Sequence, residues 1–198
     1  MKIQSRAITP FLEKPDPAIA AVLIYGPDSG LVSHRCKTLG TSYVGDLSDP
    51  FSVVELQASV LKDDPARLDD EARAISLGGS VRLVQLRGAG DNTTKILKSY
   101  LENPAAQSII IVDGDDLGPR SSLRKLFEEG DRTAALACYA LEGRELAKSC
   151  EAILGELGCT IDQDGLQTLV SALGTNHSVI RQELEKLALY VGDKTHIG

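Results

Sequence analysis

The chain has 198 residues, of which 42% are hydrophobic, and it carries a formal net charge of −7 at pH 7. This length allows one ordinary domain with its own core and a smaller second one, and the acidic balance argues against a protein that binds DNA or RNA by itself. No apolar run reaches the roughly 20 residues that span a bilayer, and the first residues lack the layout of a signal peptide, so a cytoplasmic location is expected.

Apolar runs alternate with amphipathic stretches up to residue 139, which is typical of a mainly parallel sheet covered by helices. Strands are expected at residues 22–25, 53–57, 82–86, 108–112 and 134–139. Helices are expected at about 29–39, from 64–65 to 78–79, at 93–101 and at 120–128. In the second helix Leu68, Ala72 and Ile75 share one face. These elements predict an α/β domain over residues 1–141.

The pattern changes after residue 139, where the strands stop and three helical stretches follow. They are expected near residues 142–157, 164–173 and 179–191. The simplest interpretation is a small three-helix domain over residues 142–198. Gly143 relaxes the backbone between the two domains, so residues 141–144 are the expected hinge.

A degenerate nucleotide-binding loop follows the first strand. A working P-loop reads G-x-x-x-x-G-K-[ST], because its glycines let backbone N–H groups wrap the phosphates and its lysine neutralises them. Here residues 26–33 read GPDSGLVS, with Val32 in place of the lysine. Asp28 adds a negative charge where the triphosphate would lie. The residues of this degenerate nucleotide loop are therefore Gly26, Asp28, Gly30, Val32 and Ser33.

The second signature of a nucleotide hydrolase is an apolar strand that ends in acids, and residues 108–116 read SIIIVDGDD. In a hydrolysing ATPase the aspartate holds magnesium and the next residue, a glutamate, orients the attacking water. Asp113 is present, but Gly114 cannot act as that glutamate. The sequence therefore predicts an NTPase scaffold used for something other than hydrolysis, with no bound cofactor or metal.

Two other functions stay open. A P-loop ATPase with unusual ligands would bind nucleotide in spite of Val32. A receiver-like regulatory domain would accept a phosphoryl group on Asp113, although it would need further acids behind the first strand and a lysine near the last one. Asp115 and Asp116 are interpreted as residues that cap or solvate the turn before Pro119.

The cysteines and histidines are scattered and form no zinc-binding pattern. Buried or idle thiols in a reducing compartment are expected for the four cysteines, and surface or packing roles for the three histidines. Arg120, Arg124 and Lys125 form a basic cluster, which is a solvated face or, for Arg120, an arginine finger donated to a neighbouring subunit.

A short segment at the end of the second helix, residues 74–79, reads AISLGG. A large apolar side chain held by a stiff helix and followed by two glycines is a good anchor for a partner's pocket. Leu77 could have this role. Alternatively, Ile75 and Leu77 both pack on the sheet.

Five segments in chain order resemble the delta subunits of the bacterial DNA polymerase III clamp loader. They are residues 21–33, AVLIYGPDSGLVS; 71–77, EARAISL; 119–127, PRSSLRKLF; 137–139, ACY; and 181–190, RQELEKLALY. The resemblance covers nearly the whole chain and implies an AAA+-like α/β domain with a degenerate P-loop, followed by a helical lid domain.

The resemblance implies a non-catalytic subunit of the DNA-directed DNA polymerase holoenzyme, a nucleotidyltransferase complex. Such a subunit binds the ring-shaped beta sliding clamp and opens it for loading onto primed DNA. Its partners are the gamma or tau and delta prime subunits, and DNA is touched only through the assembled complex. No membrane partner is implied.

The family's clamp anchor is a leucine followed by a phenylalanine, after a serine at the tip of a helix. Ser76 and Leu77 match the serine and leucine, whereas Gly78 occupies the aromatic position. Loss of an aromatic ring weakens an anchor, and Ile75 or the glycine turn is expected to compensate. The clamp-binding residues implied are thus Ile75, Ser76, Leu77 and Gly78. The family also has a C-terminal collar domain that is absent here, which implies a shortened chain or a piece of a longer one.

Overall fold

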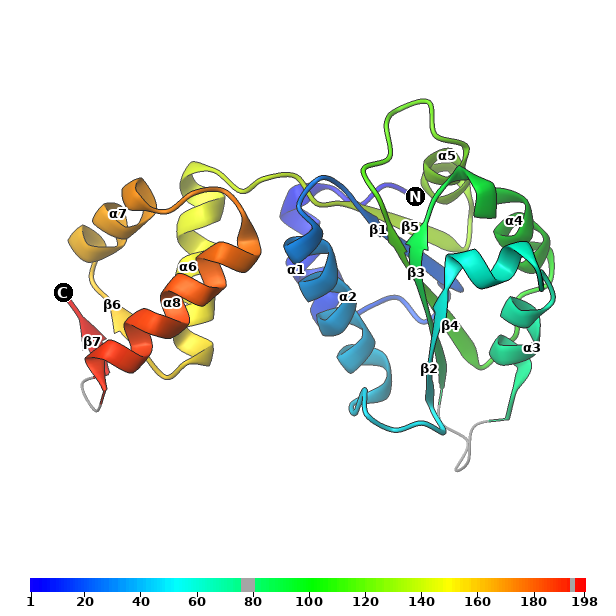
Figure 1. Ribbon diagram of the computed structural model, residues 1–198, viewed down its shortest axis with the longest axis horizontal. Helices are drawn as coiled ribbons and strands as arrows, with labels where there is room; N and C mark the ends of the chain where they lie inside the picture. The colour runs from blue at the N-terminus through cyan, green and yellow to red at the C-terminus, as the bar shows by residue number, and fades with distance from the viewer. Residues whose placement is uncertain (76–80, 193–194) are drawn as a thin grey trace. The chain divides into compact units, whose positions relative to one another are not determined.

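The computed structural model describes residues 1–75, 81–192 and 195–198 (Figure 1). The chain divides into two compact units, Met1–Cys138 and Tyr139–Gly198. None of the helices in the described part of the chain has the length and hydropathy needed to cross a bilayer.

The first unit is built on a five-stranded sheet in the order β2-β3-β4-β1-β5. All neighbouring strands are parallel. Central strands of a parallel sheet are buried on both faces and therefore need continuous apolar runs, and the side chains of β1, AVLIY, are all buried. The strands are β1 (Ala21–Tyr25), β2 (Val53–Gln57), β3 (Arg82–Ala89), β4 (Ser108–Gly114) and β5 (Thr133–Ala137).

Helices cover both faces of this sheet (Figure 1). On one face lie α1 (Ser5–Glu13) and α2 (Ser29–Val44), and on the other lie α3 (Arg67–Arg73), α4 (Thr94–Glu102) and α5 (Ser122–Glu129). Two short 3₁₀ helices, η1 (Ala58–Lys62) and η2 (Asp91–Thr93), connect strands to helices. On the face that α3, α4 and α5 cover, apolar side chains from these three helices, from η1 and from β1, β3 and β4 form a core, with Phe127 of α5 fully buried in it.

The described residues of the second unit form three helices, α6 (Gly143–Glu156), α7 (Gln163–Ala172) and α8 (His177–Val191). Its core is made by Leu146, Cys150, Ile153 and Leu154 of α6 against Ile180 and Leu184 of α8. A short parallel pair, β6 (Thr160–Ile161) and β7 (His196–Ile197), was not predicted from the sequence.

The second crossover helix is shorter than predicted. Instead of running from residues 64–65 to 78–79, α3 begins at Arg67 and ends at Arg73. Ala74 has an extended backbone, with φ −59° and ψ 134°. Leu68 and Ala72 are buried as the predicted helix face required, but Ile75 is 93% exposed because the chain has already left the helix. The prediction that Ile75 packs on the sheet is therefore wrong.

Helix α1 was missed altogether, because Pro10 lies inside it and an internal proline removes a backbone donor. The helix is held by burial of Ile8 and Leu12. The remaining predicted elements are present, with their ends shifted by a few residues.

Candidate functional site: the loop after the first strand

Backbone contacts join the loop after β1 to the end of β5. Cys138 N donates to Tyr25 O at 2.7 Å, and Asp28 N donates to Cys138 O at 3.4 Å. Gly26 has a φ of 144°, and a Cβ at this position would lie 2.3 Å from Cys138 O. Glycine alone permits so close an approach of two backbones. Gly26 therefore serves the packing of the loop on the β5 end.

Asp28 fills the N-terminus of α2 with its own side chain. Its Oδ1 accepts a hydrogen bond from Leu31 N at 3.0 Å, and the residue is only 5% exposed. In a nucleotide-binding loop the first-turn N–H groups of the helix hold the phosphates. Here one of those donors is already bonded to a carboxyl oxygen of the chain, so a phosphate at this position would have to displace Asp28.

The other loop positions lie within the first five residues of α2. Val32, at the position of the lysine, is 2% exposed, Gly30 is half-buried, and Ser33 is exposed. A buried valine offers no charge to a triphosphate. Gly26, Asp28, Gly30, Val32 and Ser33 thus lie together at the carboxyl end of β1, and none of them supplies a cation.

Asp113, at the end of β4, is paired with an arginine. Arg87 Nη1 lies 3.0 Å from Asp113 Oδ2, and the same guanidinium pairs with Glu55 at 3.1 Å. A magnesium ion at Asp113 would compete with this guanidinium. Among the described residues, no three or more His, Cys, Asp or Glu side chains lie together so that they could hold a metal ion.

The position of the water-orienting glutamate has no room for a side chain. A Cβ at Gly114 would lie 2.9 Å from Leu23 Cδ1 and 3.2 Å from the Cβ of Tyr25. Such distances require the neighbours to shift, so the sheet packing itself favours glycine here. The loop, Asp113 and Gly114 together lack the cation, the free metal ligand and the water-orienting carboxylate that hydrolysis uses.

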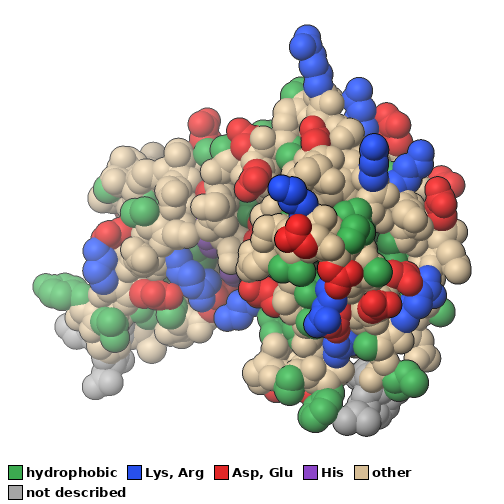
Figure 2. Space-filling model, turned by 45° about the vertical axis from the view of Figure 1, so that its right-hand side comes forward, with side chains coloured by type: hydrophobic (Ala, Val, Ile, Leu, Met, Phe, Trp, Pro, Cys, Tyr) green, Lys and Arg blue, Asp and Glu red, His purple; other side chains and the backbone are tan. Residues whose placement is uncertain are grey.

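The basic cluster is not one surface. Arg124 is buried, where it pairs with Glu128 at 2.9 Å and lies over the ring of Tyr25, 5.2 Å from its centroid. Arg120 and Lys125 are exposed. On the face that Figure 2 shows, acidic and basic side chains are intermingled. Arg124 is therefore a structural residue, contrary to the solvated face that the sequence suggested.

The four cysteines are all free and buried, as predicted. Burial raises the pKa of the Cys138 thiol to about 11, so this thiol stays protonated at neutral pH. A protonated, buried thiol is a poor nucleophile.

Asp91, after β3, caps α5 from a distant part of the chain. Its Oδ1 accepts from Leu123 N at 3.0 Å and from Ser121 Oγ at 2.6 Å. These bonds hold the pKa of Asp91 below its ordinary value of 3.8. The unfolded chain therefore takes up this proton at a higher pH than the folded one, and the stabilisation is lost as pH falls through the folded-state pKa.

We expect Asp91→Asn to reduce the loss of stability that the protein shows on acidification. Urea unfolding of both proteins between about pH 3 and 6 measures this. The free energy of unfolding of the wild type should fall more steeply with decreasing pH. Equal pH dependence in the two proteins would contradict the role given to these hydrogen bonds.

The predicted clamp anchor falls at the end of α3. Ile75 is described and almost wholly exposed, whereas Ser76, Leu77 and Gly78 lie outside the described residues. Ile75 therefore faces solvent at the point where the chain leaves the helix.

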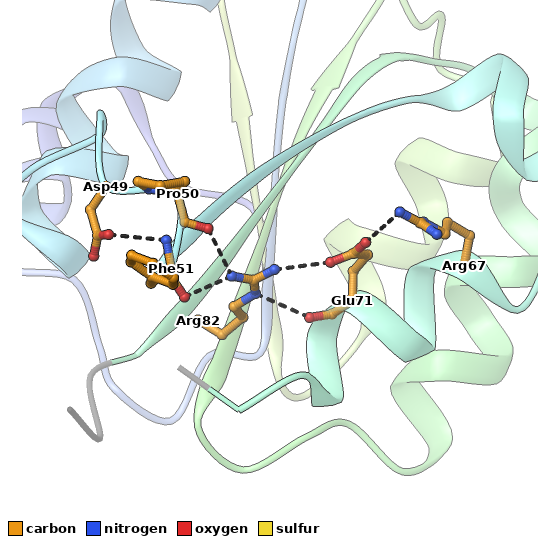
Figure 3. A network of polar contacts seen from close by, with 6 residues as sticks. All are labelled: Asp49, Pro50, Phe51, Arg67, Glu71 and Arg82. Carbon is orange, nitrogen blue, oxygen red and sulfur yellow. Dashed lines mark hydrogen bonds and ion pairs between the residues drawn. The ribbon is translucent and has the colours of Figure 1, made fainter. Parts of the chain in front are cut away.

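A buried arginine between Phe51 and the last turn of α3 was missed by sequence reasoning (Figure 3). Arg82 is 9% exposed. Its Nη1 donates to Phe51 O at 2.7 Å and to Pro50 O at 3.5 Å. Its Nε donates to Glu71 O at 3.3 Å, and its Nη2 pairs with Glu71 Oε2 at 2.9 Å. Glu71 also pairs with Arg67 at 2.7 Å. The sole signal in the sequence was a charge at the first position of a buried strand.

Comparisons with known proteins find relatives among clamp-loader subunits. The chain is 28% identical over 180 residues to the probable DNA polymerase III subunit delta of Rickettsia prowazekii, a match that covers 88% of the chain and 52% of the relative. Its fold is similar to the DNA clamp loader delta protein of Bacillus subtilis, with a TM-score of 0.63 and 20% identity, over 98% of the chain and 60% of that protein.

A DNA polymerase III gamma subunit-related protein of Thermotoga maritima is similar as well, with a TM-score of 0.53 and 14% identity, over 93% of the chain and 58% of that protein. No protein-family model matches the chain. The chain thus spans little more than half the length of the relatives it matches.

The parallel sheet, with helices on both faces and a helical unit after it, confirms the predicted AAA+-like α/β fold. In sequence and in fold, the chain resembles the delta subunits of the bacterial DNA polymerase III clamp loader.

Proposed function

We propose that the chain is the part of a DNA polymerase III delta subunit that binds and opens the beta sliding clamp. The likeness to delta subunits in sequence and fold supports a role in clamp loading. Residues 1–141 would contact the clamp, and residues 142–198 would form the lid domain that connects them to the rest of the loader. A cytoplasmic location goes with this role.

The observation that carries the proposal is the state of the nucleotide loop. Asp28 caps α2 at the phosphate position, Val32 is buried at the lysine position, and Arg87 holds Asp113. A scaffold retained without its nucleotide chemistry suits a subunit that acts through protein contacts. We propose that this chain neither needs nor hydrolyses ATP, and that gamma or tau subunits supply that activity in a complex that also contains delta prime. Contact with DNA would occur only in the assembled complex.

Calorimetric titration with the beta clamp of the same organism tests this function. Binding with a Kd of about 1 μM or tighter, unchanged by ATP and magnesium, is the expected result. A complete lack of binding would refute the clamp-contacting role. A rise in melting temperature with ATP alone would instead support the ATPase with unusual ligands.

Leu77→Asp should weaken clamp binding by about a hundredfold, because it places a charge where an apolar anchor would be desolvated. The same titration measures the effect. The matched control is Leu189→Asp, which makes the same change at a side chain of α8 that is 82% exposed. If Leu77→Asp binds as tightly as this control, Leu77 is not the anchor.

A further inference from the structure

We infer that Phe51 and Ile75 form one apolar contact surface, in which Phe51 supplies an aromatic ring beside the exposed side chain that follows α3. This inference rests on the proposed function and adds a residue from a different loop to the clamp-contacting surface. Both side chains are large, apolar and exposed, at 55% for Phe51 and 93% for Ile75.

Strand register brings the two loops to one edge of the sheet. β2 and β3 are parallel, with Val53 opposite Leu83, and Leu83 N donates to Ser52 O at 2.8 Å. The residues just before each strand therefore meet at the same edge. Phe51 comes two residues before β2, and Ile75 comes seven residues before β3.

A single guanidinium joins the backbone of Phe51 to the last turn of α3, the helix that precedes Ile75 (Figure 3). Arg82 donates to Phe51 O at 2.7 Å and to Glu71 O, in the last turn of α3, at 3.3 Å. Ile75 lies two residues beyond the end of that helix. Because Arg82 is 9% exposed and salt-bridged to Glu71, the spacing of the two loops is set by a buried contact.

Phe51 is also held locally. Phe51 N donates to Asp49 Oδ1 at 3.0 Å, and Val53 N donates to Asp49 O at 2.9 Å. An aromatic side chain on a fixed backbone loses little entropy when a partner binds it. This is the property expected of a binding anchor, whereas a solvent-exposed ring on a loose loop would lack it.

Two ion pairs join four of the five charged side chains of α3, all but Asp70. Arg67 pairs with Glu71 at 2.7 Å, and Arg73 pairs with Asp69 at 2.7 Å. Arg73 also donates to Asn103 O at 2.7 Å. Apolar anchors beside a polar rim whose charges are mostly paired fit a partner that offers an apolar pocket, not a charged groove. Under the proposed function that partner is the sliding clamp.

Phe51→Ala should weaken binding to the beta clamp by at least about tenfold in calorimetric titration. The matched control is Val60→Ala, at an exposed apolar residue of η1, which follows the opposite end of β2. Val60→Ala should bind within about twofold of the wild type. Phe51→Leu should retain part of the affinity, because leucine keeps an apolar side chain at the position where alanine removes it. Melting temperatures of the three variants check that each is folded.

The outcomes separate this inference from the function on which it rests. If the wild type binds the clamp and Phe51→Ala binds equally well, the Phe51 surface is wrong and the proposed function stands. If the wild type does not bind, the function fails and the inference with it. Sedimentation that shows self-association of the wild type, lost in Phe51→Ala, would overturn the inference by identifying a second copy as the occupant.

Discussion

Replacing Gly26 with alanine should lower the free energy of unfolding of the first unit by about 3 kcal/mol or more. The added Cβ would lie 2.3 Å from Cys138 O, and the φ of 144° strains any residue with a side chain. Since the clashing atom belongs to the backbone at the end of β5, no rotamer change relieves it. Urea unfolding followed by circular dichroism measures the loss.

Gly118→Ala is the matched control, because a Cβ at Gly118 meets no atom within 4 Å. The same measurement should give a change within about 0.5 kcal/mol of the wild type. If Gly26→Ala were as stable as this control, the loop after β1 would be free to move away from β5, and the closed nucleotide loop would be a wrong description. A nucleotide titration of Gly26→Ala would then be the next experiment.

Replacing Arg82 with methionine should cost about 3 kcal/mol of stability. The side chains of Arg82 and Glu71 are only 11% and 16% exposed, so removal of the guanidinium leaves the Glu71 carboxylate and three backbone carbonyls without their buried donor. A buried charge that loses its partner is far more costly than an exposed one. The measurement is again urea unfolding.

Arg67→Met tests whether the burial of Arg82 is the reason for the large loss of stability in Arg82→Met. Arg67 pairs with the same glutamate at 2.7 Å, but its side chain is 50% exposed. An exposed pair of this kind contributes at most about 1 kcal/mol. Similar losses in Arg67→Met and Arg82→Met would mean that the charge of Glu71, not the buried position of Arg82, determines the stability of this corner.

The chain order of strands and helices is readable from local pattern. β1 and β4 lie at the centre of a parallel sheet, and their continuous apolar runs, AVLIY and SIIIV, are typical of strands that are buried on both faces. The replacement of the P-loop lysine by Val32 is likewise visible in the local sequence. The sequence therefore predicts an α/β scaffold whose nucleotide loop lacks its chemistry, without knowledge of any contact.

Only the tertiary structure shows which side chains occupy the nucleotide loop after β1 and which residues support the surface of Phe51 and Ile75. Arg87 and Asp113 are 26 residues apart, and Arg82 and Phe51 are 31 apart, so no local pattern predicts either contact. The end of α3 at Arg73 is likewise not predicted by any local pattern. Helical periodicity placed Ile75 on the buried face, whereas the extended backbone of Ala74 turns it to solvent. Periodicity describes a segment that remains helical, and it does not show where that helix ends.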